Sequence, residues 1–205
     1  EEPSLAALFF DKDDDGDLDL YVGNDVGVAY PDRLYINDGK GFFTDRGEML
    51  GFAAAGTDTM GVAVGDYDAD GLVEMVTTDF KDKPVRLYDC YDLALACSFE
   101  TTGPESLEHV KWAVGLHDFD QDRDLDLFWT TGDVYYRDGE PNQLAWSESG
   151  LFLPYVPAEG EALAVKQTSR GATFGDLDGD GDIDVVVANA DGPAQVLRNQ
   201  AATVS

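Results

Sequence analysis

An acidic nine-residue loop occurs four times in this chain, and each copy is followed by an apolar run that is typical of a β-strand. The copies begin at Asp11, Asp66, Asp118 and Asp176, so their starts are 55, 52 and 58 positions apart. A near-regular period of this size predicts a repeat architecture, in which each copy belongs to one supersecondary unit that stacks on its neighbours.

Acidic side chains occupy positions 1, 3, 5 and 9 of every loop, which is the pattern of a calcium loop. Calcium takes about six to eight oxygens from carboxylates, carbonyls and water. We expect carboxylates at these four positions and the backbone carbonyl at position 7 to be ligands. The carboxylate candidates are Asp11, Asp13, Asp15, Asp19, Asp66, Asp68, Asp70, Glu74, Asp118, Asp120, Asp122, Asp126, Asp176, Asp178, Asp180 and Asp184. The carbonyl candidates are Asp17, Leu72, Asp124 and Asp182.

The loops do not continue as EF-hands, because position 12 is Val22, Thr77, Trp129 or Val187 where that motif needs a glutamate. They also differ from one another. Arg123 stands at position 6 of the third loop, where the other three have glycine. A side chain at positive φ is strained, and a guanidinium repels a dication. We therefore expect three or four calcium ions, with the third site the weakest.

Strand signals recur along the chain with turn signals between them, and no convincing helical periodicity interrupts them. We predict four strands in each of the first three repeats and three in the last. The predicted strands are 5–10, 18–22, 32–37, 41–44, 61–64, 72–77, 85–88, 95–100, 110–115, 125–130, 143–147, 151–155, 171–174, 183–188 and 194–198. Radially arranged four-stranded units of about 50 residues are the blades of a β-propeller, an all-β fold. The expected blades span about 4–56, 57–105, 106–160 and 165–205, as a single propeller domain or segment.

The fourth repeat carries Phe174-Gly175, then Asp-x-Asp-Gly-Asp-Gly-Asp-Ile-Asp, an apolar strand and Ala188-Asn189. This pattern resembles the FG-GAP or VCBS repeat of integrin-α-like propellers. The first repeat, with Asn24-Asp25 and Pro31 to Phe43, is similar to cartilage-acidic-protein-like (ASPIC) proteins of bacteria and animals. The resemblance implies calcium in the turn between the first two strands of each blade, where the ion rigidifies the blade. It also implies an extracellular role in protein binding, adhesion or scaffolding.

The number of blades departs from that family, whose propellers usually have seven or eight. This chain supplies four, and the last lacks its outer strand. Three explanations stay open: a segment of a longer propeller, a four-bladed ring that closes alone, or two chains that together form an eight-bladed ring. The missing strand, with no spare strand before Leu5 to replace it, favours the segment.

A formal net charge of −29 argues against nucleic acid and anionic membranes as partners, since both select basic surfaces. No apolar stretch is long enough for a membrane-spanning helix, so we expect no direct membrane insertion. Cys90 and Cys97 could form a clip across a hairpin or remain two free thiols. We expect a secreted protein, extracellular or periplasmic, because calcium is abundant there.

No catalytic motif accompanies the loops, and a structural role is expected for His109 and His117, so we predict a protein that is not an enzyme. Its partner would be a protein or a glycan. A calcium-dependent lectin would stack aromatic side chains on sugars, but Trp112, Trp129 and Trp146 lie in apolar strands and are better suited to the core. The better candidates for a recognition surface are Tyr30, Tyr135 and Tyr136. A third possibility is a non-catalytic accessory subunit or domain of a larger secreted assembly.

Overall fold

The computed structural model describes residues 2–53, 56–88, 99–101, 109–135, 139–148 and 151–200 of the chain. These residues form four antiparallel sheets and one short 3-10 helix, η2 (Ala162–Ala164). The first two sheets contain β1 (Ser4–Phe10), β2 (Asp19–Asn24), β3 (Arg33–Asn37), β4 (Phe43–Asp45), β5 (Gly61–Gly65), β6 (Glu74–Thr78), β7 (Val85–Tyr88) and β8 (Phe99–Thr101). The other two contain β9 (Lys111–His117), β10 (Asp126–Thr131), β11 (Gln143–Glu148), β12 (Leu151–Pro154), β13 (Ser169–Gly175), β14 (Asp184–Asn189) and β15 (Gln195–Leu197).

Each sheet is a meander in which strands that follow one another in the chain also pair with one another. One strand lies at each of the predicted places, with ends that differ by a few residues, so the predicted all-β fold class is confirmed. Positions 95–98 of the predicted strand 95–100 lie outside the described residues. Within the described residues the fourth sheet has three strands, as expected for an incomplete last blade.

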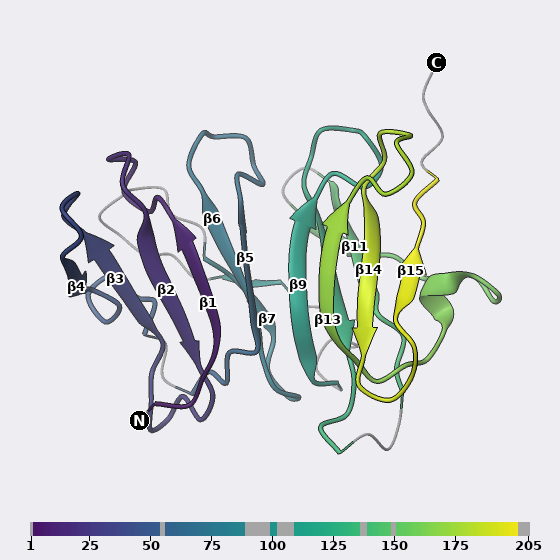
Figure 1. The fold of residues 1–205 in the computed structure, drawn as a ribbon, viewed down its shortest axis with the longest axis horizontal. Coiled ribbons are helices and arrows are strands. Elements are labelled where there is room, and N and C mark those ends of the chain that lie inside the picture. The colour runs from purple at the N-terminus through teal and green to yellow at the C-terminus, as the bar shows by residue number, and fades with distance from the viewer. Residues whose placement is uncertain are drawn as a thin grey trace.

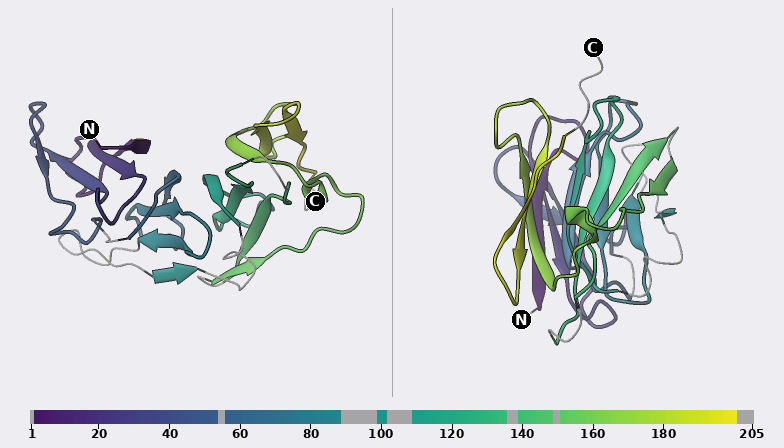
Figure 2. Two further views of the ribbon diagram at one scale, coloured as in Figure 1. Left: turned by 90° about the horizontal axis from the view of Figure 1, so that it is seen from below. Right: turned by 90° about the vertical axis from the view of Figure 1, so that its right-hand side faces the viewer.

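The four sheets are blades of a β-propeller, and they fan out in an open arc rather than a closed ring (Figures 1 and 2). The first strands of the blades, β1, β5, β9 and β13, lie next to one another along the inner side of the arc. The outer strands β8 and β12 lie on its convex side. The first two strands of every blade therefore hold its acidic loop at the same edge of the arc, the upper edge in Figure 1.

The hydrophobic core is divided into three clusters, one between each pair of neighbouring blades. Tyr21 and Leu34 of the first blade pack with Met75 of the second. The second cluster joins the second and third blades, and the third joins the third and fourth. Alternation along each strand explains this division, because successive side chains point to opposite faces of a sheet and so toward different neighbours.

A buried carboxylate adds a polar contact between the first two blades. Asp32 is fully buried, and its Oδ2 accepts hydrogen bonds from the Tyr21 hydroxyl and the Thr59 hydroxyl, each at 2.7 Å. Its Oδ1 accepts one from the Asn24 backbone N–H, also at 2.7 Å. A buried charge is tolerated where donors surround it, so this carboxylate fixes the position of one blade against the next.

Candidate metal-binding loops

The four acidic loops connect the first and second strands of the four blades, and Figure 1 shows all of them at the upper edge of the arc. In each loop the carboxylates at positions 1, 3 and 5 converge, with one oxygen from each lying within 4.8 Å of the others. The four triplets are Asp11, Asp13, Asp15; Asp66, Asp68, Asp70; Asp118, Asp120, Asp122; and Asp176, Asp178, Asp180. Twelve of the predicted ligand residues are thus brought together in threes.

Backbone hydrogen bonds repeat in all four loops and hold the triplets in the same form. In the first loop, Asp11 Oδ2 accepts the Gly16 N–H at 2.9 Å, and Asp15 Oδ1 accepts the Asp17 N–H at 3.0 Å. The same two bonds occur in the other loops, with donors Gly71, Leu72, Arg123, Asp124, Gly181 and Asp182. The chain therefore turns tightly around the three carboxylates, and position 7 lies beside position 5.

The acid at position 9 has a second task that the sequence did not reveal. Asp126 is buried, and its two oxygens accept the backbone N–H groups of Phe119 and Ser147, each at 2.9 Å. These bonds tie position 2 of the loop to the third strand of the blade. Asp19 and Asp184 make the same pair of bonds, and Glu74 accepts the N–H of Tyr67 at position 2. The position-9 acids lie outside the four triplets, and their hydrogen bonds fix each loop to the rest of its blade.

Two positions of each loop have a left-handed backbone. At position 6, φ is 89° at Gly16, 91° at Gly71, 95° at Gly181 and 83° at Arg123. The predicted strain at Arg123 is therefore present. Sequence reasoning missed position 4, where Asp14, Ala69 and Gln121 have φ of 55°, 59° and 64°. The one signal for it is Gly179, a glycine at position 4 of the fourth loop, with φ of 80°.

The carboxylates of the loops disfavour one another's ionised form. Burial raises the pKa of Asp13, and repulsion from Asp19, Asp15 and Asp11 raises it further. Burial and the charge of Asp122 raise the pKa of Asp120. Burial raises the pKa of Asp126 to about 6, although its two backbone hydrogen bonds oppose the shift. A dication would relieve this repulsion, because an opposite charge favours the ionised form.

Unpaired oxygens provide a test of whether a cation fits. Among the described residues, four buried side-chain N or O atoms have no hydrogen-bond partner, and two of these are Asp13 Oδ1 and Asp66 Oδ1 in the loops. A buried oxygen without a donor is costly, and a hard cation satisfies several at once. The donor set fits calcium. In the fourth loop one triplet acid forms a salt bridge within the protein, since Arg198 Nη1 lies 3.1 Å from Asp178 Oδ2.

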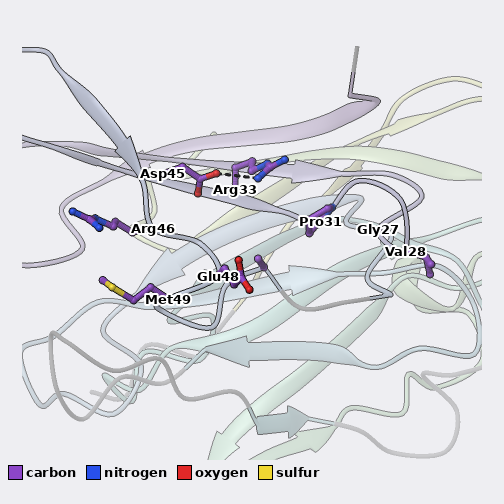
Figure 3. Close-up of a pocket in the computed structure, with 9 residues that line it drawn as sticks. Gly27, Val28, Pro31, Arg33, Asp45, Arg46, Glu48 and Met49 are labelled. Atoms are coloured by element: carbon purple, nitrogen blue, oxygen red, sulfur yellow. Dashed lines mark hydrogen bonds and ion pairs between the residues drawn. The ribbon is translucent and has the colours of Figure 1, made fainter.

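A groove of about 810 Å³ lies on the first blade, between residues 27–33 and residues 45–53 (Figure 3). Figure 3 shows Arg33 and Asp45 meeting along one side of it, and these form an ion pair of 3.0 Å. Arg33 also pairs with Glu2 at 2.7 Å. The apolar side chains Val28 and Met49 at the groove are exposed. Sequence reasoning did not find this groove, because its walls come together only in the fold.

The three tryptophans pack within the protein, as their apolar strand patterns predict. Trp129 is buried in the cluster of the second and third blades, and Trp146 packs beside that of the third and fourth. Trp112 donates its indole N–H to the Gly132 carbonyl, and the Arg170 guanidinium lies 4.1 Å from its ring centre. All three rings are thus engaged within the protein rather than offered to a sugar.

The remaining candidates divide between surface and core. Tyr30 and Tyr135 are exposed, at 38% and 73%, whereas Tyr136 lies outside the described residues, as do Cys90 and Cys97. His117 packs on Phe174, with ring centres 4.5 Å apart, and burial lowers its pKa. In the described part of the chain, no helix is long and apolar enough to cross a membrane.

Comparisons with known proteins agree with this architecture. The family model of the FG-GAP-like repeat matches residues 11–77 and 118–187, more than half of the chain. Cartilage acidic protein 1 from Mus musculus is 29% identical over 191 residues, and the human protein is 29% identical over 184 residues. Each alignment covers 87% of this chain but only 28% and 27% of the mouse and human proteins, so the chain spans little more than a quarter of those relatives.

A solved structure with the same fold is a lectin from Agrocybe aegerita that recognises non-reducing terminal N-acetylglucosamine. Its TM-score is 0.60 at 16% sequence identity, over 97% of this chain and 54% of the lectin chain. At that identity the likeness is one of fold.

Proposed function

This chain belongs to the FG-GAP-like repeat family, and we propose that it is a calcium-binding propeller module in which the ions stabilise the blades. The observation that carries the proposal is the recurrence of one carboxylate triplet in four consecutive blades, with a buried, unpaired oxygen in two of them. In these loops calcium would neutralise the converging carboxylates and lock the turn between the first two strands. Each ion would thereby add stability to the folded state alone.

The residues assigned to the ions are the triplets, supported by the position-7 carbonyls and the position-9 carboxylates. The third site is the weakest of the four in this proposal, because Arg123 strains its turn and brings a positive charge close to the ion. Calcium modules with affinities of about 10⁻⁴–10⁻³ M work outside cells. We place the protein in that setting, extracellular or periplasmic.

Native mass spectrometry with and without a chelator tests the proposal. We expect three or four calcium ions on the chain, and one fewer on Asp13→Asn, which removes charge from a triplet with an unpaired oxygen. Glu159→Gln is the matched control, since this exposed acid lies outside the loops, and it should retain every ion. A wild-type chain that binds no calcium at millimolar concentration would reject the proposal.

As the role of the module we propose protein binding, adhesion or scaffolding, with no catalytic step. The engaged tryptophans support a protein ligand over a glycan, because aromatic stacking on sugars needs an open ring face. The groove on the first blade, with exposed Val28 and Met49 at its walls, is the proposed contact surface. Sugar-competed retention on a polysaccharide resin would instead establish the lectin alternative. An accessory domain with no ligand of its own would show neither kind of binding.

A further inference from the structure

The third and fourth acidic loops leave their sheets at neighbouring places, because the strands that precede them, β9 and β13, lie next to each other (Figure 1). At this edge the side chains of Gln121 and Asn199 make hydrogen bonds from one blade to the other. Gln121 is position 4 of the third loop, and Asn199 lies two residues after the end of β15. We call these two contacts the loop links.

The first loop link joins Gln121 to Asp182, since the Gln121 side-chain amide donates to Asp182 Oδ1. Asp182 is position 7 of the fourth loop and is 4% exposed, whereas position 7 of the other three loops is half-buried. A buried carboxylate needs a donor, and Gln121 provides one. At position 4 the other loops have Asp14, Ala69 and Gly179, which have no side-chain N–H to donate, so this bond is particular to the third loop.

Both ends of the first link lie close to a carboxylate triplet. Gln121 stands between Asp120 and Asp122, two acids of the third triplet. On the other side, the Asp182 N–H donates to Asp180 of the fourth triplet at 3.0 Å, and the Asp182 carbonyl is a proposed ligand. An ion in either loop therefore fixes the backbone from which this link extends.

The second loop link passes through Asn199. Its side-chain amide donates to the carbonyl of Phe119, at position 2 of the third loop, and its backbone N–H donates to Asp184 Oδ1 at 2.8 Å. Asp184 is the position-9 acid of the fourth loop, and its Oδ2 accepts the Leu177 N–H at 3.0 Å. The Phe119 N–H in turn donates to Asp126, the position-9 acid of the third loop. One run of hydrogen bonds thus connects the position-9 acids of both loops.

We propose that the third and fourth loops bind calcium cooperatively, with Gln121 and Asn199 as the positioning residues that couple them. This coupling rests on the proposed calcium function. Without an ion the carboxylates of a loop repel one another, so binding an ion includes the cost of ordering the loop. Because the links hold the two loops together, an ion in one loop orders part of the other, which then binds its own ion more tightly. The effect is reciprocal, and each ion raises the affinity for the other by the same factor.

The third site depends most on this coupling. Its turn is strained at Arg123, whereas the fourth loop has Gly179 and Gly181 at its two left-handed positions. The fourth loop therefore fills first and supports binding in the third.

Two substitutions remove the links and introduce residues that other blades already have at the same places. Gln121→Ala introduces the residue of the second loop, Ala69, whose φ of 59° is close to the 64° of Gln121. Asn199→Ser introduces the residue of the third blade, Ser147, and keeps the backbone N–H that each of them donates to a position-9 acid. The double variant should therefore fold, and its circular dichroism spectrum in excess calcium verifies this.

Native mass spectrometry of the full chain during a calcium titration measures the coupling. We expect the double variant Gln121→Ala/Asn199→Ser to need about tenfold more calcium than the wild type to fill its last site, a factor within the usual range for coupled sites. Asp178→Asn, which disables the fourth site, should remove two ions at calcium concentrations that just fill the wild type, because the third site loses its support. Asp13→Asn is the matched control, since it disables the first site and should remove one ion.

The same substitution in the double variant separates coupling from a purely structural effect. With the links removed, Asp178→Asn should remove one ion only, at calcium concentrations that just fill the double variant. If Asp178→Asn and Asp13→Asn each remove one ion from the wild type, or if the double variant fills at the same calcium concentration as the wild type, the sites are independent. Either result would overturn the coupling and leave the proposed calcium function intact. A wild type without bound calcium would overturn both.

Discussion

Gly16 and Arg123 occupy the same position of the first and third acidic loops and share a left-handed backbone, with φ of 89° and 83°. Glycine adopts this conformation freely, while a side chain pays strain for it. Arg123→Gly should therefore raise the free energy of unfolding by about 1 kcal/mol and tighten calcium binding at the third site. Arg123→Ala is the control, because it removes the charge but keeps the strain. Thermal melts and calcium titrations of the two variants decide; equal melting temperatures would contradict the strain argument.

When calcium is absent, substituting the position-9 acid and substituting a triplet acid should have different effects on stability. Asp126 accepts two backbone N–H groups in the core of its blade, so Asp126→Asn should cost about 2 kcal/mol in chelator, because its amide nitrogen turns a donor toward a donor. Asp120→Asn removes a repelled charge and retains an acceptor for the Asp122 N–H, so it should be neutral or stabilising in chelator. Urea unfolding at pH 8 in chelator measures both. Equal losses would mean that position 9 has no bracing role.

Much of the fold could be predicted from the sequence, because the loop repeat fixes the period and the strand pattern fixes what lies between the loops. The convergence of positions 1, 3 and 5 follows from the same spacing. The sequence predicts the position-9 acid only as a metal ligand, whereas its carboxylate also accepts the N–H of a residue on the third strand, such as Ser147. That contact depends on strand pairing, which a single loop sequence does not encode.

Contacts between blades were the other part that the sequence could not supply. The donors of Asp32 include Thr59, 27 residues away, and no local pattern marks this pair. Likewise, the sequence indicated apolar strands but not which face of each strand meets which neighbour.

Removing calcium should make stability depend on salt. Each triplet places three carboxylate oxygens within 4.8 Å of one another, and their repulsion is screened when the Debye length falls from about 10 Å at 0.1 M salt to about 3 Å at 1 M. Without calcium, the melting temperature should rise between these salt concentrations. With calcium bound, the same change in salt should have a smaller effect. Melts in sodium chloride with chelator or with calcium make the comparison, and equal slopes would argue against bound ions.

A buried lysine between the second and third blades should give the protein an alkaline pH dependence. Lys111 is fully buried, and its Nζ donates to the His109 carbonyl at 3.0 Å and to the Phe80 carbonyl at 3.4 Å. Burial lowers the pKa of Lys111 from 10.5 to about 8, although the charges of Asp79 and Asp82 oppose this. Between these two pH values the unfolded chain binds a proton that the folded chain does not.

Stability should therefore rise with pH from about 8 to 10.5 and gain on the order of 3 kcal/mol from this group. Below pH 8 the lysine is charged in both states and adds no further slope. Lys111→Met should abolish the rise, while Lys40→Met, at an exposed turn, should keep it. Urea unfolding of each variant and the wild type at pH 8 and pH 10.5 gives the difference. If Lys111→Met and the wild type gain the same stability across this window, the gain comes from another titrating group. Lys111 would then keep its proton in the folded state throughout the window.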